Sequence, residues 1–399
     1  MDLPVITLST ARRSRHPWIY RKMVRRPRER LEPGALVEIR ARTGEFAGRG
    51  IYNPKSEVAV RVLTEDPAET LGPEFFRGRL ARAGELRQTV LRIPERSDAY
   101  RLVHGEADGL SGLVVDRFAD VLVVKPYSAG YVRTLDWLVD ALGNLYPGSR
   151  VVARADETTA RREGFRVEDV ERRFPPVGRV AVREHDLRME VDLASGHKTG
   201  YFLDQRDNRR RLAELVRGMK VLDCFSYTGG FAISAMLAGA ASATAVELDE
   251  KALDVGRRNA ALNGVQVEFV HRDVFDCLRD MLARGEEVDA IVLDPAKLAA
   301  VRAEVPRAMR TYGDMNRLAF QVVRDGGLVL SCSCSGLVSE GEFLSIISRS
   351  AAEAGATLQI FAVTGAAPDH PVSSIFPEGR YLKAVFSRVA RTRRRQDRP

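Results

Sequence analysis

Strand-like and helix-like stretches alternate through the second half of the chain, and this alternation constrains the fold more than any other feature. After about residue 190, short apolar runs are separated by amphipathic stretches long enough to form helices. Such a pattern builds βαβ units, whose strands lie parallel in one sheet with helices on its faces. The expected fold class is therefore α/β. The predicted strands are residues 219–224, 243–248, 265–270, 290–293 and 327–332.

Two later apolar runs, residues 357–363 and 381–389, are joined by a loop that contains proline and glycine and no helix. Strands joined without a crossover helix pair antiparallel, so these runs predict a hairpin at one edge of the sheet. Residues 391–399 are polar and basic with few apolar side chains, which predicts a disordered tail.

The first half of the chain has a different pattern, and 399 residues exceed what one hydrophobic core usually organises. Residues 35–39 and 58–63 alternate apolar and polar side chains between glycine-containing turns, as in a small barrel-like β domain. Helical and strand-like runs then mix. We therefore expect a β domain over residues 1–72, an α+β domain over 73–188 and the α/β domain over 189–399.

A glycine-containing turn follows the first predicted parallel strand, which ends at Asp223, and leads into an alanine-rich helix. Glycines let the backbone approach a ligand, and the amino end of a helix presents free N–H groups. An ordinary tight turn remains the alternative, and the Gly-x-Gly-x-x-Gly pattern of a dinucleotide site is absent. The turn residues expected to lie against a ligand are Phe225, Ser226, Tyr227, Thr228 and Gly229.

Two further acids follow the next two strands. Glu247 ends the second strand, where its carboxylate can accept hydrogen bonds from both hydroxyls of a ribose. Asp273, followed by Val274, comes after the third strand and can receive an adenine amino group. A single acid of this kind more often caps a helix. Three acids at successive strand ends, however, would meet at the carboxyl edge of one sheet, where open α/β sheets bind ligands.

The chain is basic, with a formal net charge of +8 and a pI of about 9.4, which favours a polyanionic partner such as RNA. An arginine-rich composition whose basic faces are merely solvated is the alternative. Residues 1–50 hold twelve basic residues against five acids. These basic residues are Arg12, Arg13, Arg15, Arg21, Lys22, Arg25, Arg26, Arg28, Arg30, Arg40, Arg42 and Arg49.

No run of about 18 apolar residues appears, and the start lacks the order of a secretory signal, so we expect a cytoplasmic protein without a membrane span. Four cysteines are too few for a disulfide framework in a chain of this size, which predicts reduced thiols. Cys332 and Cys334 lack the further ligands that a structural zinc site needs, so no metal is expected.

Several segments together resemble the bacterial large-subunit rRNA cytosine-C5 methyltransferases with an amino-terminal PUA domain, which belong to the class I enzymes that use S-adenosylmethionine. This resemblance implies a PUA domain, a middle α+β domain, a Rossmann-like methyltransferase domain, S-adenosylmethionine as cofactor and ribosomal RNA as partner. It nominates Gln205 and Arg206 for the methionine end of the cofactor. The matching segments are residues 16–20 (HPWIY), 50–56 (GIYNPKS), 106–113 (EADGLSGL), 199–206 (TGYFLDQR), 224–230 (CFSYTGG), 333–336 (SCSG) and 369–371 (DHP).

Cys334 is the nucleophile that the resemblance implies, through its Ser-Cys-Ser-Gly match. Methylation of cytosine C5 needs a group that adds to C6, and a thiolate does this well because cysteine is both a strong nucleophile and a good leaving group. Cys334 follows the predicted strand where Gly336 permits a turn, at the edge that carries the cofactor acids. Cys332 lies deeper on the same strand and is expected to be a packed residue, as are Cys224 and Cys277.

Asp294 ends the fourth strand and is expected to hydrogen-bond the N3 or N4 edge of the base. The segment 294–298 reads Asp-Pro-Ala-Lys-Leu, whereas the related family usually has Asp-Pro-Pro-Lys-Phe. Ala296 and Leu298 therefore depart from the pattern where the base should be recognised. The role of Lys297, as a catalytic group or a phosphate contact, stays open.

No residue stands out as the base that removes the C5 proton. Water and His370 are both candidates, and a loop histidine with satisfied hydrogen bonds is the competing interpretation of His370. Two other functions stay open: methylation of an exocyclic amine or of uracil C5, and a noncatalytic RNA-binding role in ribosome assembly. A homodimer is compatible with the sequence.

Overall fold

The computed structural model describes residues 3–10, 14–27, 29–174, 177–194 and 201–391, and the chain forms two compact units. Residues 368–379, the middle of the loop between the last two strands of unit 2, belong to unit 1. The expected domain limits at residues 72 and 188 stay predictions, and all of the expected tail after Arg391 lies outside the described residues. Unit 1 comprises Met1–Arg183, Val191–Leu203 and Pro368–Gly379, and unit 2 comprises Glu184–Glu190, Asp204–Ala367 and Arg380–Pro399.

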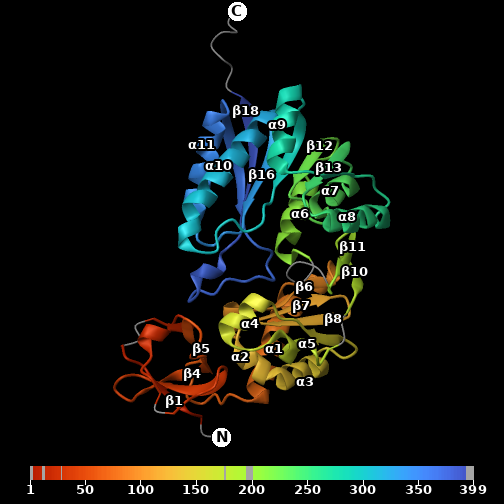
Figure 1. The fold of residues 1–399 in the computed structure, drawn as a ribbon. Coiled ribbons are helices and arrows are strands. Elements are labelled where there is room, and N and C mark those ends of the chain that lie inside the picture. Colours follow the sequence, from red (N-terminus) through yellow and green to blue (C-terminus); the bar gives the residue numbers. More distant parts are fainter. Residues whose placement is uncertain (1–2, 11–13, 28, 175–176, 195–200, 392–399) are drawn as a thin grey trace, which may run out of the picture. The chain divides into compact units, whose positions relative to one another are not determined.

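Unit 2 is built on a seven-stranded sheet with the order β14-β13-β12-β15-β16-β18-β17 (Figure 1). The first five strands in this order are parallel, and β18 is antiparallel to both β16 and β17. The parallel sheet and the hairpin at its edge are thus confirmed. The strands are β12 (Lys220–Cys224), β13 (Ser242–Glu247), β14 (Glu268–His271), β15 (Val288–Leu293), β16 (Val323–Ser333), β17 (Ala356–Thr364) and β18 (Lys383–Arg391).

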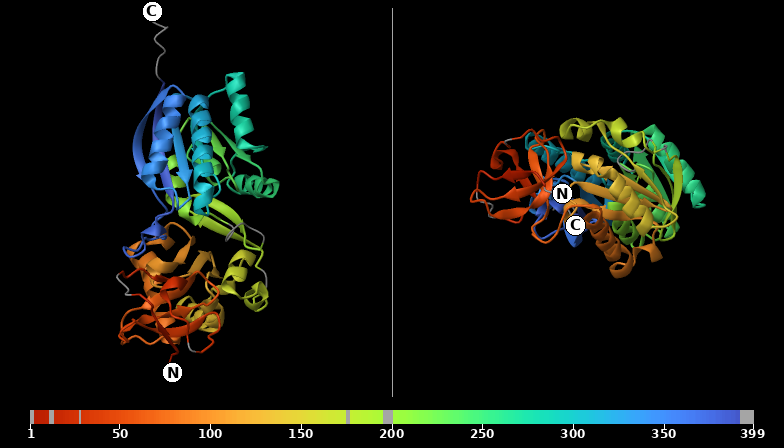
Figure 2. Two further views of the ribbon diagram at one scale, coloured as in Figure 1. Left: turned by 60° about the vertical axis from the view of Figure 1, so that its left-hand side comes forward. Right: turned by 90° about the horizontal axis from the view of Figure 1, so that it is seen from below.

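Helices cover both faces of this sheet (Figure 2). One core packs α9, α10 and α11 against the strands, and a second core packs α6 and α7 against the opposite face. This is a doubly wound α/β arrangement, so the expected fold class is confirmed. The helices are α6 (Arg206–Ala213), α7 (Gly230–Leu237), α8 (Glu250–Leu262), α9 (Val274–Arg284), α10 (Val305–Val322) and α11 (Glu340–Glu353).

The strand order reverses between β12 and β15. From β12 the chain moves outward to β13 and β14, and then returns to β15 on the other side of β12. Cys224 is in register with Leu293, and Leu293 is in register with Ser331 of β16. The residues that follow these strands therefore emerge together, at the point of an open α/β sheet where ligands bind.

Unit 1 contains a five-stranded sheet with the order β1-β3-β4-β5-β2. Its alternating strands bury one set of side chains, among them Val37, Ile39 and Val60, in a core of their own. The β structure expected near the amino terminus is therefore present. The strands are β1 (Val5–Thr7), β2 (Trp18–Tyr20), β3 (Ala35–Arg40), β4 (Phe46–Tyr52) and β5 (Val58–Thr64).

A four-stranded sheet, β6-β7-β8-β9, forms a second part of unit 1. Its core includes Leu80 of α1 and Leu138 of α3, which pack with strand residues such as Leu122. The mixture of helices and strands expected for this region is present. The elements are α1 (Pro73–Glu85), β6 (Ala99–His104), β7 (Leu113–Phe118), β8 (Val121–Pro126), α2 (Ala129–Arg133), α3 (Leu135–Leu145), β9 (Arg150–Ala153), α4 (Glu157–Glu163) and α5 (Val167–Glu171).

The chain next forms β10 (Arg179–Glu184) and β11 (Leu187–Asp192), which pair as a two-stranded sheet. The strand boundaries differ from the sequence expectation by one to four residues; β16 begins earlier, at Val323, and β14 begins only at Glu268. The turn that ends α8 occupies Val265, whose N–H donates to the carbonyl of Ala260. Within the described residues, no helix combines the length and the apolar character that a bilayer crossing requires.

Candidate active site

The loop after β12 has a backbone conformation that only a few residues normally adopt. Phe225, Tyr227 and Gly229 all have positive φ angles, of 61°, 49° and 79°. For the two non-glycine residues this conformation costs roughly 1–2 kcal/mol each. Such strain is typical of ligand-binding turns, where the surrounding structure holds the chain in place. A Cβ at Gly229 would lie 3.0 Å from the Phe269 ring, so the turn also needs its glycine for space.

Asp223, at the end of β12, is a buried carboxylate with incomplete hydrogen bonding. Its Oδ2 accepts from the N–H of Ala232 at 3.0 Å, whereas its Oδ1 has no partner among the described residues. Burial raises the pKa of Asp223 to about 8, and the charges of Asp294 and Glu247 add to this effect. The mutual influence of the three carboxylates indicates that they lie close together. The buried Oγ of Ser226 likewise has no partner within the described chain.

Glu247 orders the loop as well as facing the site. Its Oε2 accepts from the N–H of Tyr227 at 2.9 Å, and its Oε1 accepts from Leu248 and Asp249 at 2.8 and 3.1 Å. A carboxylate oxygen has two lone pairs. Oε1 uses both in these bonds, whereas Oε2 uses one and can still accept from a ribose hydroxyl. The first turn after β12 and the end of β13 are thereby tied together.

Asp273 is the amino-terminal cap of α9, as its position directly before a helix allows. Its Oδ1 accepts from the N–H groups of Phe275 and Asp276 at 2.9 and 3.2 Å. The cap fixes the direction of the carboxylate, and the other oxygen is the one that can meet an adenine amino group. Val274 is buried in the core beneath it, and Thr228 is also buried; the contact of either residue with a cofactor stays a prediction.

Gln205 and Arg206, nominated for the methionine end of the cofactor, are both buried in unit 2. The Gln205 Oε1 accepts from the Asn208 side chain at 2.7 Å. Its Nε2 has no nitrogen or oxygen partner in the described structure and faces the Cys332 thiol, which is a weak acceptor. The Arg206 side chain is fully enclosed and lies 3.1 Å from Asp207.

These polar groups fit a charged nucleoside cofactor. Three buried atoms have no nitrogen or oxygen partner among the described residues, on Asp223 and Ser226 at the end of β12 and on Gln205 beside Cys332 of β16, and unpaired buried polar groups are rare in proteins. Carboxylates suit a ligand that carries ribose hydroxyls and positive charge. Among the described residues, no cluster of three potential metal ligands occurs.

Cys334 lies directly after β16 and is partly exposed, whereas Cys332 is fully buried. Burial raises the pKa of the Cys332 thiol, and of the Cys224 thiol, well above the usual value. Cys332 and Cys224 are thus the packed residues expected from the sequence. Cys277 differs from expectation because it is only partly buried, at the edge of the core formed with α9.

A hydroxyl network supports the segment around Cys334. The Ser333 Oγ donates to the Tyr312 hydroxyl at 3.0 Å, and that hydroxyl lies 3.0 Å from the Ser335 Oγ. Ser335 also accepts from the N–H of Ala299 at 3.2 Å, which ties this turn to the loop after β15. Both serines and Tyr312 are buried, so the residues on either side of Cys334 are held firmly.

Asp294 follows β15 and is partly exposed. Its charge acts on the pKa values of Asp223, Tyr312 and Cys332, which places it between the cofactor acids and the cysteine segment. Ala296 and Lys297 are exposed beyond it, whereas Leu298 is partly buried against the core, so the departure from the usual motif falls on one exposed and one partly buried residue.

Lys383 is a functional candidate that sequence reasoning missed. It begins β18 and is 2% exposed. Its Nζ donates to the carbonyls of Ser335 at 2.7 Å and Tyr381 at 2.9 Å, so it reaches the turn that carries Cys334. Burial lowers the pKa of Lys383 to about 8. The available signal was a lysine inside an apolar strand run, where a charged side chain is rarely buried without a role.

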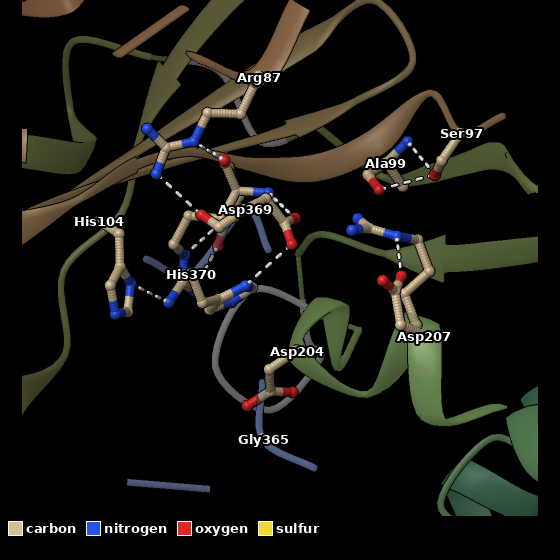
Figure 3. Close-up of polar contacts among 12 residues, drawn as sticks. Arg87, Ser97, Ala99, His104, Asp204, Asp207, Gly365, Asp369 and His370 are labelled. Carbon is tan, nitrogen blue, oxygen red and sulfur yellow. Dashed lines mark hydrogen bonds and ion pairs between the residues drawn. The ribbon is translucent and has the colours of Figure 1, made fainter. Parts of the chain in front are cut away.

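His370 lies in unit 1 and is buried. Its ring stacks edge-on against His104 at 5.1 Å, and its Nδ1 is 3.2 Å from the Asp369 carboxylate. Figure 3 shows these groups beside Arg87, which donates to the Asp369 carbonyl at 2.8 Å. The N–H of Arg101 donates to the Asp369 carboxylate at 2.9 Å. These contacts favour a structural role for His370 over that of a general base.

The basic residues near the amino terminus that the structure describes are mostly exposed. Lys22, Arg25 and Arg26 are exposed and have no ion-pair partner within the described part of the chain. Arg15 instead pairs with Glu65 at 2.9 Å, and Arg40 with Glu38 at 2.6 Å. Arg12, Arg13 and Arg28 lie outside the described residues.

Comparison with known proteins identifies two regions of the chain. Residues 110–372 match a family model described as S-adenosylmethionine-dependent methyltransferase, and residues 9–65 match one described as a PUA-like domain. The ribosomal RNA large subunit methyltransferase I of Escherichia coli strain K12 is 39% identical over 380 residues, which cover 94% of this chain and 96% of that protein.

Two solved structures share the fold over 97% of this chain and 100% of their own. One, named as a methyltransferase complexed with SAH, has a TM-score of 0.81 at 19% identity. The other, named as a methyltransferase from Streptococcus mutans, has a TM-score of 0.79 at 18% identity. The expected cofactor is thereby confirmed. The chain belongs to the family of S-adenosylmethionine-dependent methyltransferases and carries a PUA-like domain near its amino terminus.

Proposed function

We propose that this protein methylates C5 of a cytosine in the RNA of the large ribosomal subunit, with Cys334 as the nucleophile. The carrying observation is that Cys334 directly follows β16 and that the charges of Cys334 and Asp294 both act on the buried Tyr312 and Cys332, at the edge of the sheet where Asp223 and Glu247 also lie. The class of RNA follows from the Escherichia coli relative, which is named as a ribosomal RNA large subunit methyltransferase.

The chemistry explains why a cysteine is needed. Cytosine C5 is too poor a nucleophile to attack a methyl donor, and addition of the Cys334 sulfur to C6 creates an enamine whose C5 can attack. The cofactor supplies the electrophilic methyl group. The C5 proton then leaves to water, and the bond between sulfur and C6 breaks with its electron pair returning to Cys334.

Asp294 holds the base while this happens. A carboxyl group beside the N3 or N4 edge of cytosine makes C6 more electrophilic when it hydrogen-bonds a protonated N3. The tie between Ser335 and Ala299 keeps the loop after β15 and the cysteine turn at a constant separation. Asp294 and Cys334 thus follow neighbouring strands, β15 and β16. Reaction is faster when the base and the nucleophile are held in a fixed relative orientation.

The PUA-like region supplies affinity for RNA. Exposed cations bind phosphates by releasing counterions, so affinity should fall steeply as salt rises. Replacement of Lys22, Arg25 and Arg26 by glutamine should flatten the plot of log affinity against log salt, by about 0.7–0.9 for each phosphate that the variant no longer neutralises. An unchanged slope would place the RNA-binding surface elsewhere. The target base then has to leave the stacked RNA to reach Cys334.

The decisive experiment uses large-subunit RNA that contains 5-fluorocytidine, incubated with S-adenosylmethionine. Fluorine cannot leave C5 as a cation, so the covalent adduct between Cys334 and C6 should persist as a species of low mobility in denaturing gels. Cys334→Ala should abolish the adduct, and Cys277→Ala, which changes a partly buried thiol away from the site, should form it as the wild type does.

An adduct of undiminished yield in Cys334→Ala would disprove the role of this cysteine. Mass spectrometry of nucleosides from normal RNA after reaction decides the position, because 5-methylcytidine is expected. Methyl groups found only on an exocyclic amine or on uracil would overturn the proposed base.

A further inference from the structure

Lys383 is a buried cation beside the cysteine turn. It is paired across the antiparallel strands with Ser333, one residue before Cys334. Its Nζ reaches past the end of β16 to the Ser335 carbonyl at 2.7 Å. Its other hydrogen bond within the described residues goes to the Tyr381 carbonyl at 2.9 Å. One ammonium group therefore binds two backbone carbonyls, that of Ser335 after β16 and that of Tyr381 before β18.

Buried ammonium groups normally pair with a carboxylate, because desolvation of the charge costs several kcal/mol. Among the described residues, no carboxylate lies within ion-pair distance of the Lys383 Nζ. A negatively charged partner would offset the desolvation cost of the Lys383 ammonium group. Cys334, whose thiol can lose its proton, lies on the turn that Lys383 contacts.

The charged groups that act on Lys383 come from the loop after β15, the turn after β16 and α11. Burial is the main reason that the pKa of Lys383 falls to about 8, and the positive charge of Lys297 after β15 acts in the same direction. Cys334 after β16 is the strongest opposing group, followed by Glu340 and Glu342 of α11. Glu342 is engaged in the cap of α11, where it accepts from Ser339 at 2.6 Å. The turn that Lys383 contacts through the Ser335 carbonyl therefore also carries Cys334, the group whose negative charge most opposes the effect of burial on Lys383.

We propose that Lys383 is a positioning residue for Cys334, which it holds in place through the Ser335 carbonyl and keeps in the thiolate form through its positive charge. In this step the S–H bond of Cys334 breaks, its proton passes to solvent, and the electron pair stays on sulfur. Lys383 keeps its three protons throughout. The use of this thiolate in methyl transfer rests on the proposed function, whereas its stabilisation by Lys383 does not.

The test measures the thiol chemistry directly, without RNA. The full-length protein is treated with iodoacetamide at pH 5.5–10, and alkylation of Cys334 is followed by fragment-ion mass spectrometry, which separates it from Cys332 on the same peptide. Only the thiolate reacts, so the midpoint of rate against pH reports the thiol pKa. Lys383→Met should raise this midpoint by about one pH unit or more, a tenfold smaller thiolate fraction at neutral pH.

Two further variants separate charge from structure. Lys383→Arg keeps the positive charge and should leave the midpoint near or below the wild-type value. Lys220→Met removes an exposed lysine at the opposite end of β12 and should change nothing. A purely structural role for Lys383 would alter alkylation rates at every pH without moving the midpoint. An unmoved midpoint in Lys383→Met overturns the proposal.

If Lys383→Met does not fold, comparison of Lys383→Arg with the wild type decides. The lysine loses its charge near pH 8 and the arginine does not, so the thiolate of Lys383→Arg should stay stabilised above that pH. A midpoint raised in folded Lys383→Arg to that of an ordinary thiol overturns the electrostatic claim. This failure can be distinguished from failure of the proposed function. If Cys334 is not the nucleophile toward RNA, Cys334→Ala still forms the RNA adduct, whereas the alkylation profile of Cys334 and its dependence on Lys383 are unaffected.

Discussion

The carboxylate of Asp223 makes the stability of unit 2 depend on pH in a direction opposite to that of most acids. Its pKa is raised to about 8 in the folded protein, mainly by burial, from an ordinary value of 3.8. The folded state therefore holds this proton more tightly than the unfolded state does. The favourable contribution is complete below about pH 3.8 and is lost as the pH rises toward about 8.

The size of the effect follows from the linkage relation. Each pH unit inside this window changes the free energy of unfolding by about 1.4 kcal/mol for one proton. Between pH 5.5 and 7.5 the loss is thus roughly 2–3 kcal/mol. Asp223→Asn removes the titrating group and keeps an oxygen that can accept from the N–H of Ala232. The variant should therefore match the wild type more closely at pH 5.5 and exceed it in stability at pH 7.5.

The assay is urea unfolding of both proteins without cofactor, at pH 5.5 and 7.5. Unit 2 is identified as the transition that S-adenosylmethionine shifts to higher urea, because a ligand stabilises the part that binds it. Other titrating groups are common to both proteins and cancel in the difference. A difference between the proteins that stays constant with pH would refute the conclusion that Asp223 is protonated in the folded state near neutral pH.

Three further outcomes follow from buried polar groups. Arg87→Met should lower the stability of unit 1 by about 3–5 kcal/mol, since it removes a bidentate partner of Asp108 at 2.6 and 2.9 Å; thermal unfolding checks this. Arg209→Met should cost more stability than the double change Arg209→Met with Glu184→Leu, because the single change leaves a buried carboxylate behind; urea unfolding of both variants checks this. Gln205→Leu should weaken S-adenosylmethionine binding about tenfold by calorimetry, since its Nε2 has no nitrogen or oxygen partner among the described residues, and should lower the stability of unit 2 by only about 1–3 kcal/mol, because it removes the acceptor of one Asn208 hydrogen bond.

The grouping of the three candidate cofactor acids could be predicted from the sequence because each lies at or near the carboxyl end of a strand, whereas their contacts with a cofactor stay a prediction. In a parallel sheet the carboxyl ends of neighbouring strands meet at one edge, so Asp223, Glu247 and Asp273 come together once the strand order is known. The sequence pattern cannot reveal the hydrogen bonds that these acids already make. Glu247 and Asp273 accept from backbone N–H groups, so both shape the loops as well as facing the ligand.

Lys383 could not be predicted because its neighbours are distant in sequence. It reaches Ser335 only because β18 inserts between β16 and β17, which reverses the order expected of consecutive strands. The packing of the segment between β17 and β18 could not be predicted either. Its ends belong to unit 2, whereas residues 368–379 belong to unit 1. Periodicity shows that these strands form a hairpin, but it carries no information about where a long connecting loop packs.

The two halves of the site therefore tolerate sequence change differently. Asp223 and Glu247 accept backbone hydrogen bonds that order the loops, so loss of the accepting oxygen at either position is expected to disturb the fold as well as cofactor binding. Ala296 is exposed, so a change there is expected to leave stability nearly unchanged. Alanine instead of the family's proline at position 296 is therefore expected to affect recognition of the RNA base and not the fold. Restoration by Ala296→Pro should change the preference for the RNA target while leaving S-adenosylmethionine affinity and stability as they are, and equilibrium binding and unfolding measured beside methylation would separate these effects.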